Sequence, residues 1–260
     1  MMELSGAPVD VDSLASLALV GFGHFTSMLV ENCAVRGLEL HLDRLIRDCR
    51  AVFDARLDPD RVRDVVRSAV RDATGPVVVR VTVYDPELQL SRPGARADPR
   101  LLVTTRAAPT TPQAPLRLRS VAYSRDLPQI KHVGLFGALH HRAAAQRAGF
   151  DDAVFVDGGG SISEIVTSNI AFINGGGELV WPRAEALVGT TMRLIDQSCG
   201  KRVLTDHIPL SQLGQYVGAV ATNAATGVRA VTSIDDISWP VHEMVAELRD
   251  RYESIPPQQI

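Results

Sequence analysis

One proline-rich segment constrains the fold of this chain more than any other feature. Residues Ala107–Pro115 read Ala-Ala-Pro-Thr-Thr-Pro-Gln-Ala-Pro and are poor in apolar side chains. Prolines hold such a segment extended and keep it out of helices and central strands. A chain of 260 residues is long enough for two domains that each bury a core. The sequence therefore predicts a first domain over residues 1–106, a linker over 107–115 and a second domain over 116–260.

The first predicted domain shows both helical and strand periodicity. Apolar residues recur at helical spacing from Leu42 to Phe53, and Asp58-Pro59 supplies the N-cap and first-turn proline of a second helix. The β-branched run Val77–Tyr84 is typical of a buried strand. Further strands are expected within Leu14–Phe25, Ser27–Ala34 and Leu101–Thr105.

The second predicted domain alternates short strands with helices. Helices are expected at Leu135–Arg147, Thr190–Gln197 and Val241–Tyr252, and the tail from Ile255 is expected to fray. Strands are expected at Leu116–Tyr123, Ala153–Val156, Ile162–Val166, Asn169–Ile173, Leu179–Val180, Arg202–Leu204, Ala219–Thr222 and Val228–Thr232. This pattern predicts a two-domain chain of the α/β (α+β) class.

The composition narrows the possible partners. With 45% apolar residues, 22% charged residues and a net charge of −3, the chain offers no broad basic surface to nucleic acid or to an anionic membrane. No apolar run approaches the length of a bilayer span, and the N-terminus lacks the positive start of a signal peptide. Cys33, Cys49 and Cys199 are few and widely spaced, which favours a reducing cytoplasm and no zinc site. The adjacent His140 and His141 point different ways on a helix, so a metal pair is not expected.

Lysine is nearly absent from the chain. Among 27 basic residues, only Lys131 and Lys201 are lysines. Arginine stays charged, whereas a buried lysine can lose its proton and attack a carbonyl group. Scarcity alone favours a solvated lysine. However, Lys131 lies between a predicted strand and a predicted helix among other motifs with chemical potential, so a primary amine is expected to be needed there.

Three of those motifs offer an anion site and a carboxylate. Gly189-Thr190-Thr191 opens a predicted helix and can present backbone N–H groups and hydroxyls to an anion, although such a sequence is usually only a helix cap. Arg44 could bind a phosphate through its guanidinium fork, although a lone arginine is more often solvated. Glu164 lies on an apolar strand, where it either faces solvent or needs a partner.

Together these residues fit the needs of one cofactor. Pyridoxal phosphate requires an amine for a Schiff base, a carboxylate for its pyridinium nitrogen and an anion site for its phosphate. The carboxylate keeps the ring nitrogen protonated, so that the ring can accept electrons from a substrate. The phosphate site fixes the ring relative to the lysine.

The motifs resemble those of the class IV, or fold-type IV, pyridoxal-phosphate family from about Gly21 to Asp235. That family includes branched-chain aminotransferases, D-amino-acid aminotransferases, (R)-amine transaminases and aminodeoxychorismate lyases. Single motifs are weakly specific, but five in the same order are strongly specific. They are the helical pattern at His41, Leu42, Arg44 and Leu45; the lysine Lys131; the strand motif at Gly160, Ile162, Ser163, Glu164 and Asn169; the turn at Leu187, Val188, Gly189, Thr190 and Thr191; and the late segment at Thr222, Asn223, Ala224, Gly227, Val228, Ile234 and Asp235.

The resemblance implies a two-domain fold-type IV enzyme, with a small α/β domain and a larger pseudo-barrel domain, which forms a homodimer and binds pyridoxal 5′-phosphate between its domains. It implies that Lys131 forms the Schiff base and that Glu164 pairs with the pyridine nitrogen. It also implies that Arg44 and the Gly189–Thr191 turn hold the phosphate and that Leu187 packs on the ring. The implied cofactor-binding residues are Arg44, Lys131, Glu164, Leu187, Gly189, Thr190, Thr191, Asn223 and Ala224.

The chain departs from the family pattern at three positions. Val188 replaces the proline of the phosphate turn. Phe136 stands where many of the aminotransferases have a tyrosine. Ala224 stands where a threonine often binds the phosphate, a role that Asn223 or backbone N–H groups are expected to take over.

Candidate substrate-pocket residues come from the segments around these motifs. No clear arginine-histidine pair for the carboxylate of a D-amino acid is present. Arg80, Arg92 and Arg96 are possible substitutes, although a surface location is the preferred interpretation of each. The expected substrate-binding residues are His24, Phe25, Phe136 and Ala225.

The expected function is transfer of an amino group between an amino acid or amine and a 2-oxo acid, with Lys131 as the catalytic residue. A lyase that releases pyruvate, as in aminodeoxychorismate lyase, is the alternative within the family. A non-catalytic protein that binds pyridoxal phosphate is the alternative of another class. One fold supports all three, so the fold cannot decide between them.

Overall fold

A computed structural model describes residues 2–109, 113–199 and 203–260, and it divides the chain into two compact units. Unit 1 comprises Met1–Ala108, Ile130–Gly134 and Pro256–Ile260, and unit 2 comprises Pro109–Gln129 and Leu135–Ile255. The chain first passes from unit 1 to unit 2 inside the predicted linker, of which residues 110–112 lie outside the described residues. Two short segments of the range 116–260, Ile130–Gly134 and Pro256–Ile260, belong to unit 1, and the predicted domain bounds stay a prediction.

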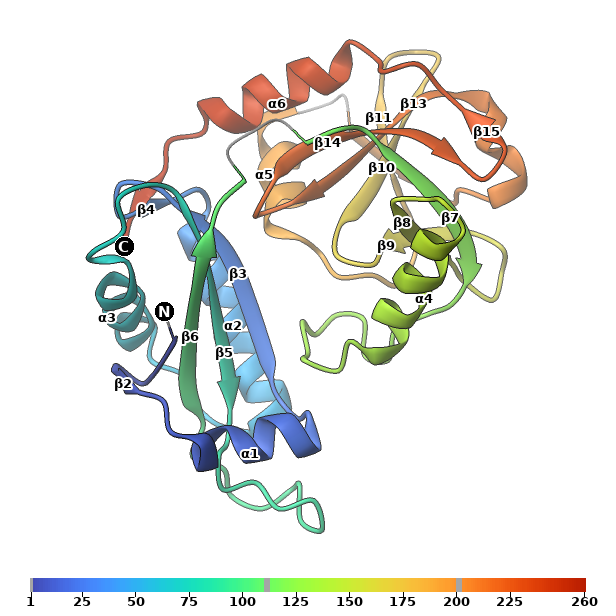
Figure 1. The fold of residues 1–260 in the computed structure, drawn as a ribbon. Helices are drawn as coiled ribbons and strands as arrows, with labels where there is room; N and C mark the ends of the chain where they lie inside the picture. Colours follow the sequence, from blue (N-terminus) through green and yellow to red (C-terminus); the bar gives the residue numbers. More distant parts are fainter. Residues whose placement is uncertain (1, 110–112, 200–202) are drawn as a thin grey trace. The chain divides into compact units, whose positions relative to one another are not determined.

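Unit 1 is a five-stranded antiparallel sheet covered by two helices (Figure 1). Val79, Val81 and Val83 point to the same side of the sheet, where they meet the apolar stripes of both helices in one core. The strands, in sheet order, are β2 (Ala7–Pro8), β1 (Met2–Leu4), β6 (Arg100–Ala107), β5 (Val77–Tyr84) and β3 (His24–Val30), and the covering helices are α2 (Leu38–Phe53) and α3 (Pro59–Val70).

Helices α2 and α3 form where the apolar periodicity predicts them. The Asp58 side chain accepts a hydrogen bond from the backbone N–H of Asp60 at 2.9 Å, and Pro59 is the first residue of α3, as expected of an N-cap followed by proline. Helix α2 begins at Leu38, earlier than its apolar stripe indicated. This earlier start places His41 and Arg44 well inside the helix.

Helix α1 (Val11–Val20) corrects the expectation of a strand within Leu14–Phe25. The Asp10 side chain accepts hydrogen bonds from the Ser13 backbone N–H at 2.7 Å and from its hydroxyl at 2.6 Å, and Gly21 ends the helix in the left-handed conformation. The helix was missed because Val11 and Leu19 are exposed, so apolar residues occur on both of its sides and hide the helical period.

Unit 2 is built on a curled nine-stranded sheet (Figure 1). Strand β9 ends the strand order, yet it also contacts β10 and β11 near the opposite end, so the sheet closes toward a barrel. The strand order is β12 (Val203–Asp206), β11 (Leu179–Pro182), β10 (Asn169–Asn174), β13 (Tyr216–Asn223), β14 (Gly227–Ile234), β7 (Leu116–Ala122), β8 (Asp152–Val156) and β9 (Ile162–Ile165), with β15 (Ile237–Ser238) paired to β14.

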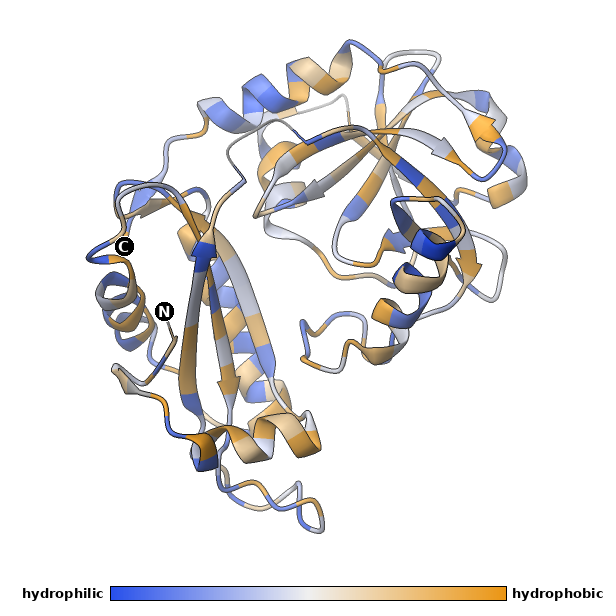
Figure 2. Cartoon of the chain, viewed as in Figure 1, coloured by the Kyte–Doolittle hydropathy of each residue, from blue (hydrophilic) through white to orange (hydrophobic). Residues whose placement is uncertain are grey.

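In the described part of unit 2, three α-helices pack against this sheet. Helix α6 carries hydrophilic and hydrophobic residues along its length (Figure 2), and Met244, Leu248 and Tyr252 are buried at a spacing of four residues. The inner face of the sheet forms its own core, which includes Leu118, Ile162 and Phe172. The helices are α4 (Phe136–Arg147) against β7 and β8, α5 (Thr190–Cys199) against β13, and α6 (Met244–Ser254) against α5 and β14; the 3-10 helix η2 (Leu210–Gln215) precedes β13.

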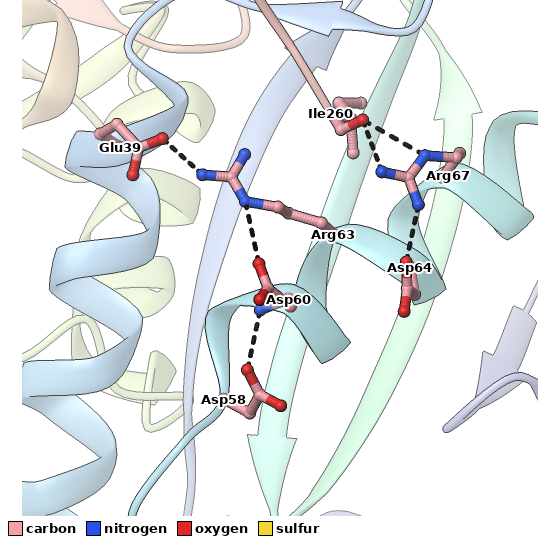
Figure 3. A network of polar contacts seen from close by, with 7 residues as sticks. All are labelled: Glu39, Asp58, Asp60, Arg63, Asp64, Arg67 and Ile260. Carbon is pink, nitrogen blue, oxygen red and sulfur yellow. Dashed lines mark hydrogen bonds and ion pairs between the residues drawn. The ribbon is translucent and has the colours of Figure 1, made fainter.

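The C-terminal tail is anchored, which corrects the expectation that it frays. Strand β16 (Gln258–Gln259) pairs with β4 (Ala34–Val35), and the Ile260 N–H donates to the carbonyl of Cys33 at 3.0 Å. Figure 3 shows the Arg67 guanidinium donating to the Ile260 carbonyl at 2.8 and 3.2 Å. Neighbouring ion pairs join Arg67 to Asp64, and Arg63 to Glu39 and Asp60. The tail is ordered because a strand ladder satisfies its backbone groups.

None of the helices in the described part of the chain combines the length and the apolarity that a bilayer crossing requires.

Candidate functional site

The segment that contains Lys131 is attached to the edge of the unit 1 sheet. The Phe25 N–H donates to the Lys131 carbonyl at 2.8 Å, and the Val133 N–H donates to the Gly23 carbonyl at 2.9 Å. A side chain at position 23 would place its Cβ only 2.7 Å from the carbonyl oxygen of Val83, so this position requires glycine. The backbone at Lys131 is therefore fixed by strand β3, although it is distant from β3 in the sequence.

The Lys131 side chain approaches the ring of Phe25. Its Nζ lies 4.9 Å from the ring centroid, and the guanidinium carbon of Arg80 lies 3.6 Å from the same centroid. Arg80 is half-buried, and burial lowers its pKa, so it is less exposed than the preferred surface interpretation indicates. Arg92 and Arg96 are exposed, as expected.

Arg44 is a buried cation on helix α2 with an unused donor. Its Nη2 donates to the Thr26 hydroxyl at 2.6 Å, while its Nε has no hydrogen-bond partner among the described residues. Burial lowers the pKa of Arg44 to about 10, against the opposing effect of Asp48, so it remains charged at neutral pH. A buried guanidinium with a spare N–H is suited to hold an anion.

His41 stabilises this arrangement as a neutral ring. Its Nδ1 lies 2.7 Å from the Thr26 hydroxyl. Burial lowers the pKa of His41 well below 6.5, and the charges of Arg44 and Lys131 lower it further. A neutral His41 can accept the hydroxyl hydrogen of Thr26 while the hydroxyl oxygen accepts from Arg44.

His24, an expected substrate residue, faces the interior of unit 1. Its side chain is fully buried, and its ring centroid lies 6.1 Å from that of Phe53. Burial lowers the pKa of His24 to about 4, although Asp48 opposes the shift. A substrate role for His24 stays a prediction, and its position in the core offers no exposed surface for a substrate.

Glu164 lies on β9 in unit 2 and is ion-paired. The Arg125 Nε donates to Glu164 Oε1 at 2.7 Å, and both side chains are less than a tenth exposed. The Leu187 N–H donates to Glu164 Oε2 at 3.4 Å, and Arg125 Nη2 donates to the Pro128 carbonyl at 2.6 Å. The expected need for a partner is thus met by Arg125, whose guanidinium pairs with the buried carboxylate and orients it.

The turn before helix α5 is held by Asn169. The Asn169 amide donates to the Leu187 carbonyl at 2.6 Å, and its oxygen accepts from the Gly189 N–H at 3.1 Å. A Cβ at position 189 would lie 2.2 Å from that oxygen and would displace the Asn169 side chain from the turn. This contact fixes the turn that leads into Thr190 and Thr191.

Three buried hydroxyls around this turn lack partners. The Oγ1 atoms of Thr190, Thr191 and Thr222 are buried without a hydrogen bond to any described residue. Thr222 lies opposite Asn169 in the β10–β13 ladder. Unpaired buried hydroxyls are costly, and the start of α5 favours negative charge. These residues therefore fit the phosphate group of the cofactor that the sequence implied.

The loop between β13 and β14 is closed by Asn223. The Asn223 Oδ1 accepts from the backbone N–H groups of Ala225 and Thr226, both at 2.9 Å, and its amide donates to the Ser168 hydroxyl at 2.9 Å. Ala224 and Ala225 are half-buried in this loop. Asn223 thus shapes the loop, and phosphate binding by Asn223 or Ala224 stays a prediction.

Phe136 is the first residue of α4 and is 86% exposed, with its ring near that of His140. This exposed position does not by itself indicate a contact with substrate, so the expected substrate role of Phe136 stays a prediction.

The sequence-predicted site residues divide between the units. His24, Phe25, Arg44 and Lys131 lie in unit 1. In unit 2 lie Phe136, Glu164, Leu187, Gly189, Thr190, Thr191, Asn223, Ala224 and Ala225.

Three residues of these clusters were not predicted from the sequence as site residues. Thr26 contacts Arg44, Arg125 contacts Glu164, and Thr222 adds a buried hydroxyl. Thr222 begins a motif that was recognised, so its hydroxyl was a usable signal. Arg125 is 39 residues from Glu164 and carried no local signal.

We predict that Thr191→Val has opposite effects on stability and on cofactor affinity. The change removes a buried hydroxyl without a protein partner, so the melting temperature of the cofactor-free protein should stay equal or rise. The same hydroxyl is expected to donate to the phosphate, so the affinity for pyridoxal phosphate should fall roughly tenfold. Thermal denaturation and a spectroscopic titration would measure the two effects.

The exposed Thr205 provides a matched control in the same unit. Thr205→Val should leave both quantities unchanged. A Thr191→Val protein that loses stability but keeps its affinity would show that the hydroxyl serves the fold alone.

Comparisons with known proteins show the family of this chain. Residues 23–234 match the amino-transferase class IV family. A probable branched-chain-amino-acid aminotransferase of Rickettsia felis is 28% identical over 126 residues, which cover 45% of this chain and 43% of that protein. A second such relative, from Rickettsia bellii, is covered over 57% of its length, so the similarity spans about half of these relatives.

Solved structures share the fold. The branched-chain aminotransferase of Thermoproteus uzoniensis, solved with norvaline, superposes with a TM-score of 0.85 at 20% identity, covering 97% of this chain and 93% of that chain. The 4-amino-4-deoxychorismate lyase of Pseudomonas aeruginosa superposes with a TM-score of 0.81 at 25% identity, covering 96% of this chain and 97% of that chain. The predicted fold class is thereby confirmed. Because the family match spans most of the sequence, this chain belongs to the class IV aminotransferases, a family of pyridoxal-phosphate-dependent enzymes.

Proposed function

We propose that this chain transfers an amino group between an amino acid or amine and a 2-oxo acid, with pyridoxal phosphate as cofactor. The observation that carries the proposal is the fixed position of Lys131. Its peptide carbonyl is bound by the Phe25 N–H, and its amine lies beside the Phe25 ring. A lysine that forms and releases a covalent bond needs a fixed backbone and a mobile side chain.

The remaining polar residues support binding of the cofactor. In the proposal, the hydroxyls of Thr190, Thr191 and Thr222 bind its phosphate, because each is buried and lacks a hydrogen bond to any described residue. Phosphate binding by the spare donor of Arg44, which lies in unit 1, stays a prediction. Glu164 would pair with the pyridine nitrogen, and the Arg125 guanidinium holds its carboxylate in place.

The chemistry divides between cofactor and protein. Bound pyridoxal phosphate supplies a carbonyl group that combines with amines and a ring that accepts electrons. The Lys131 amine first holds the cofactor and, once a substrate amine has displaced it, carries the proton that leaves the substrate carbon. Glu164 holds the proton on the ring nitrogen, and Phe25 gives the lysine side chain an apolar surface to rest on.

We predict that an amino donor alone will drive a single half-reaction. With an active donor and no acceptor, the absorbance of the lysine-bound cofactor should disappear and should return only when a 2-oxo acid is added. The reason is that transfer leaves the amino group on the cofactor until an acceptor removes it. Absorbance spectra with panels of L- and D-amino donors would measure this.

A pyruvate-releasing lyase is the second candidate, and the 25% identity to the Pseudomonas lyase over nearly the whole chain favours it over other lyases. A lyase restores the lysine-bound cofactor in every cycle and needs no acceptor. Pyruvate release from aminodeoxychorismate with an unchanged spectrum would therefore replace transfer by elimination. A cofactor spectrum that responds to neither substrate class would indicate a non-catalytic protein.

A homodimer is part of the proposal. Phe136 and Leu139 lie three residues apart on α4 and are 86% and 45% exposed, which supports an interface on this helix. Sedimentation equilibrium should give twice the mass of the chain, and Phe136→Glu should weaken the association. A wild-type monomer at all concentrations would contradict this.

A cytoplasmic location also belongs to the proposal. It is supported by Cys33, Cys49 and Cys199, which form no disulfide. Alkylation of denatured cell extracts without reductant should modify all three thiols, and a blocked pair would argue for an oxidising compartment.

A further inference from the structure

Asp48 on helix α2 is a buried carboxylate that is not explained by the roles above. Its side chain is 1% exposed. Burying a carboxylate is costly unless hydrogen bonds and a counter-charge compensate for the lost hydration. Its ion-pair partner, Arg47, has a side chain that is 57% exposed, so this pair provides only part of the compensation.

The two carboxylate oxygens of Asp48 have different partners. Oδ1 accepts from the Arg47 guanidinium, from Nε at 3.0 Å and from Nη2 at 2.7 Å. Oδ2 accepts from the backbone N–H of Lys131 at 3.1 Å, across 83 positions of sequence. Asp48 thus binds the exposed Arg47 side chain of α2 through one oxygen and the backbone N–H of Lys131 through the other.

Both backbone polar groups of Lys131, its N–H and its carbonyl, are hydrogen-bonded. Asp48 binds its N–H, and the Phe25 N–H donates to its carbonyl at 2.8 Å. The next contact along the segment is the antiparallel bridge between His24 and His132. The Lys131 N–H therefore donates to a charged side chain on helix α2 rather than to the backbone of strand β3.

We propose that Asp48 is a positioning residue for Lys131, which fixes the lysine backbone so that the released amine returns to the same place in every cycle. The inference rests on the proposed role of Lys131 in holding the cofactor. Small displacements of a reacting group lower rates steeply, so a buried charge that binds the lysine's own amide is well suited to this task.

The test compares two Asp48 variants with a matched control. Asp48→Ala removes the acceptor for the Lys131 N–H. Asp48→Asn keeps an oxygen for that N–H but loses the charge, and the exposed Arg47 can turn away from the new amide group. Asp85→Asn is the control, because Asp85 is also buried in unit 1 and accepts backbone N–H groups, those of Glu87 at 2.9 Å and Asp98 at 3.1 Å.

The first measurement uses the full chain without cofactor. Hydrogen exchange of the Lys131 amide should be roughly tenfold faster or more in Asp48→Ala, since a hydrogen bond to a charged acceptor is lost. Exchange in Asp48→Asn should lie close to the wild-type rate, and Asp85→Asn should match it. Exchange that is unaltered in Asp48→Ala would overturn the proposal without reference to any cofactor.

The second measurement follows the reaction of Lys131 with added pyridoxal phosphate. The lysine-bound absorbance should appear roughly tenfold more slowly in Asp48→Ala, with recovery in Asp48→Asn and no change in Asp85→Asn. Faster amide exchange with an unchanged rate of adduct formation would overturn the positioning role and leave Asp48 a structural residue.

The two measurements also separate this inference from the proposed function. If borohydride reduction of the wild-type protein traps no cofactor on Lys131, the proposed function fails, and the positioning role fails with it. If wild-type Lys131 is trapped normally and Asp48→Ala reacts as fast as wild type, only the positioning role fails. If Asp48→Ala does not fold, Asp48→Leu takes its place, because leucine also removes the acceptor but fills the buried volume. Its adduct formation must then be slower than that of Asp48→Asn for the proposal to stand.

Discussion

Replacing Lys131 by alanine is expected to reduce amino-group transfer by about 10⁴-fold, the upper end of the effect of a positioned acid-base group. The large effect follows from its two proposed tasks, because the same amine holds the cofactor and carries the substrate proton. Steady-state rates with an amino donor and a 2-oxo acid would measure the loss. The Lys131→Ala protein should also show no lysine-bound cofactor after borohydride reduction and peptide mapping.

Lys201 is the natural control, because it is the only other lysine in the chain. It lies outside the described residues, and Lys201→Ala should keep both the activity and the trapped adduct. Lys131→Arg should be as inactive as Lys131→Ala, since a guanidinium keeps the charge but offers no neutral amine. A pyridoxyl group on Lys201, or full activity in either Lys131 variant, would refute the proposed role.

The second large effect is expected for Glu164→Gln, with a loss of turnover on the order of 10²-fold. The proposed task of Glu164 is to hold a proton on the pyridine nitrogen, which a neutral amide cannot do as well. Glutamine keeps the size of the side chain and an oxygen that can accept from Arg125, whereas alanine would leave a cavity beside a buried guanidinium. Cofactor binding to Lys131 should persist, and single-turnover kinetics would locate the loss in the chemical step.

Glu178→Gln provides the comparison in unit 2, because Glu178 binds the Asn174 amide at 2.8 Å in a surface turn. It should retain normal turnover. Normal turnover in Glu164→Gln as well would mean that the ion pair with Arg125 serves only the stability of the barrel-like sheet. Melting temperatures of the two variants would check that any difference in rate does not come from unfolding.

Local features of the chain were predicted well wherever short-range physics determines them. Strand β5 forms over the β-branched run Val77–Tyr84, and helix α3 begins at the expected Asp58-Pro59 cap. Glycine at position 189 was expected in a turn, and a larger residue there would displace the Asn169 side chain that holds the turn. Helix α1 was the main failure, since its exposed apolar residues imitate a buried strand.

Contacts over long sequence distances could not be predicted in the same way. The tail at Gln258–Gln259 pairs with β4, and the segment around Lys131 packs with unit 1, although both follow the predicted linker. Each contact depends on a strand edge or a backbone group that becomes available only when the whole unit has folded. Secondary-structure propensity and apolar periodicity depend on residues that are close in sequence, so they carry no information about such distant partners.

The sequence by itself determined which residues are candidates for the proposed chemistry. Lys131, Glu164 and the Gly189–Thr191 turn were recognisable because a nucleophile, a carboxylate and an anion site need particular residue types in order. The tertiary structure alone decided what holds two of them. Arg125 binds Glu164, and Asp48 binds the Lys131 amide, because folding brings charges that are 39 and 83 residues away to buried groups that need a partner.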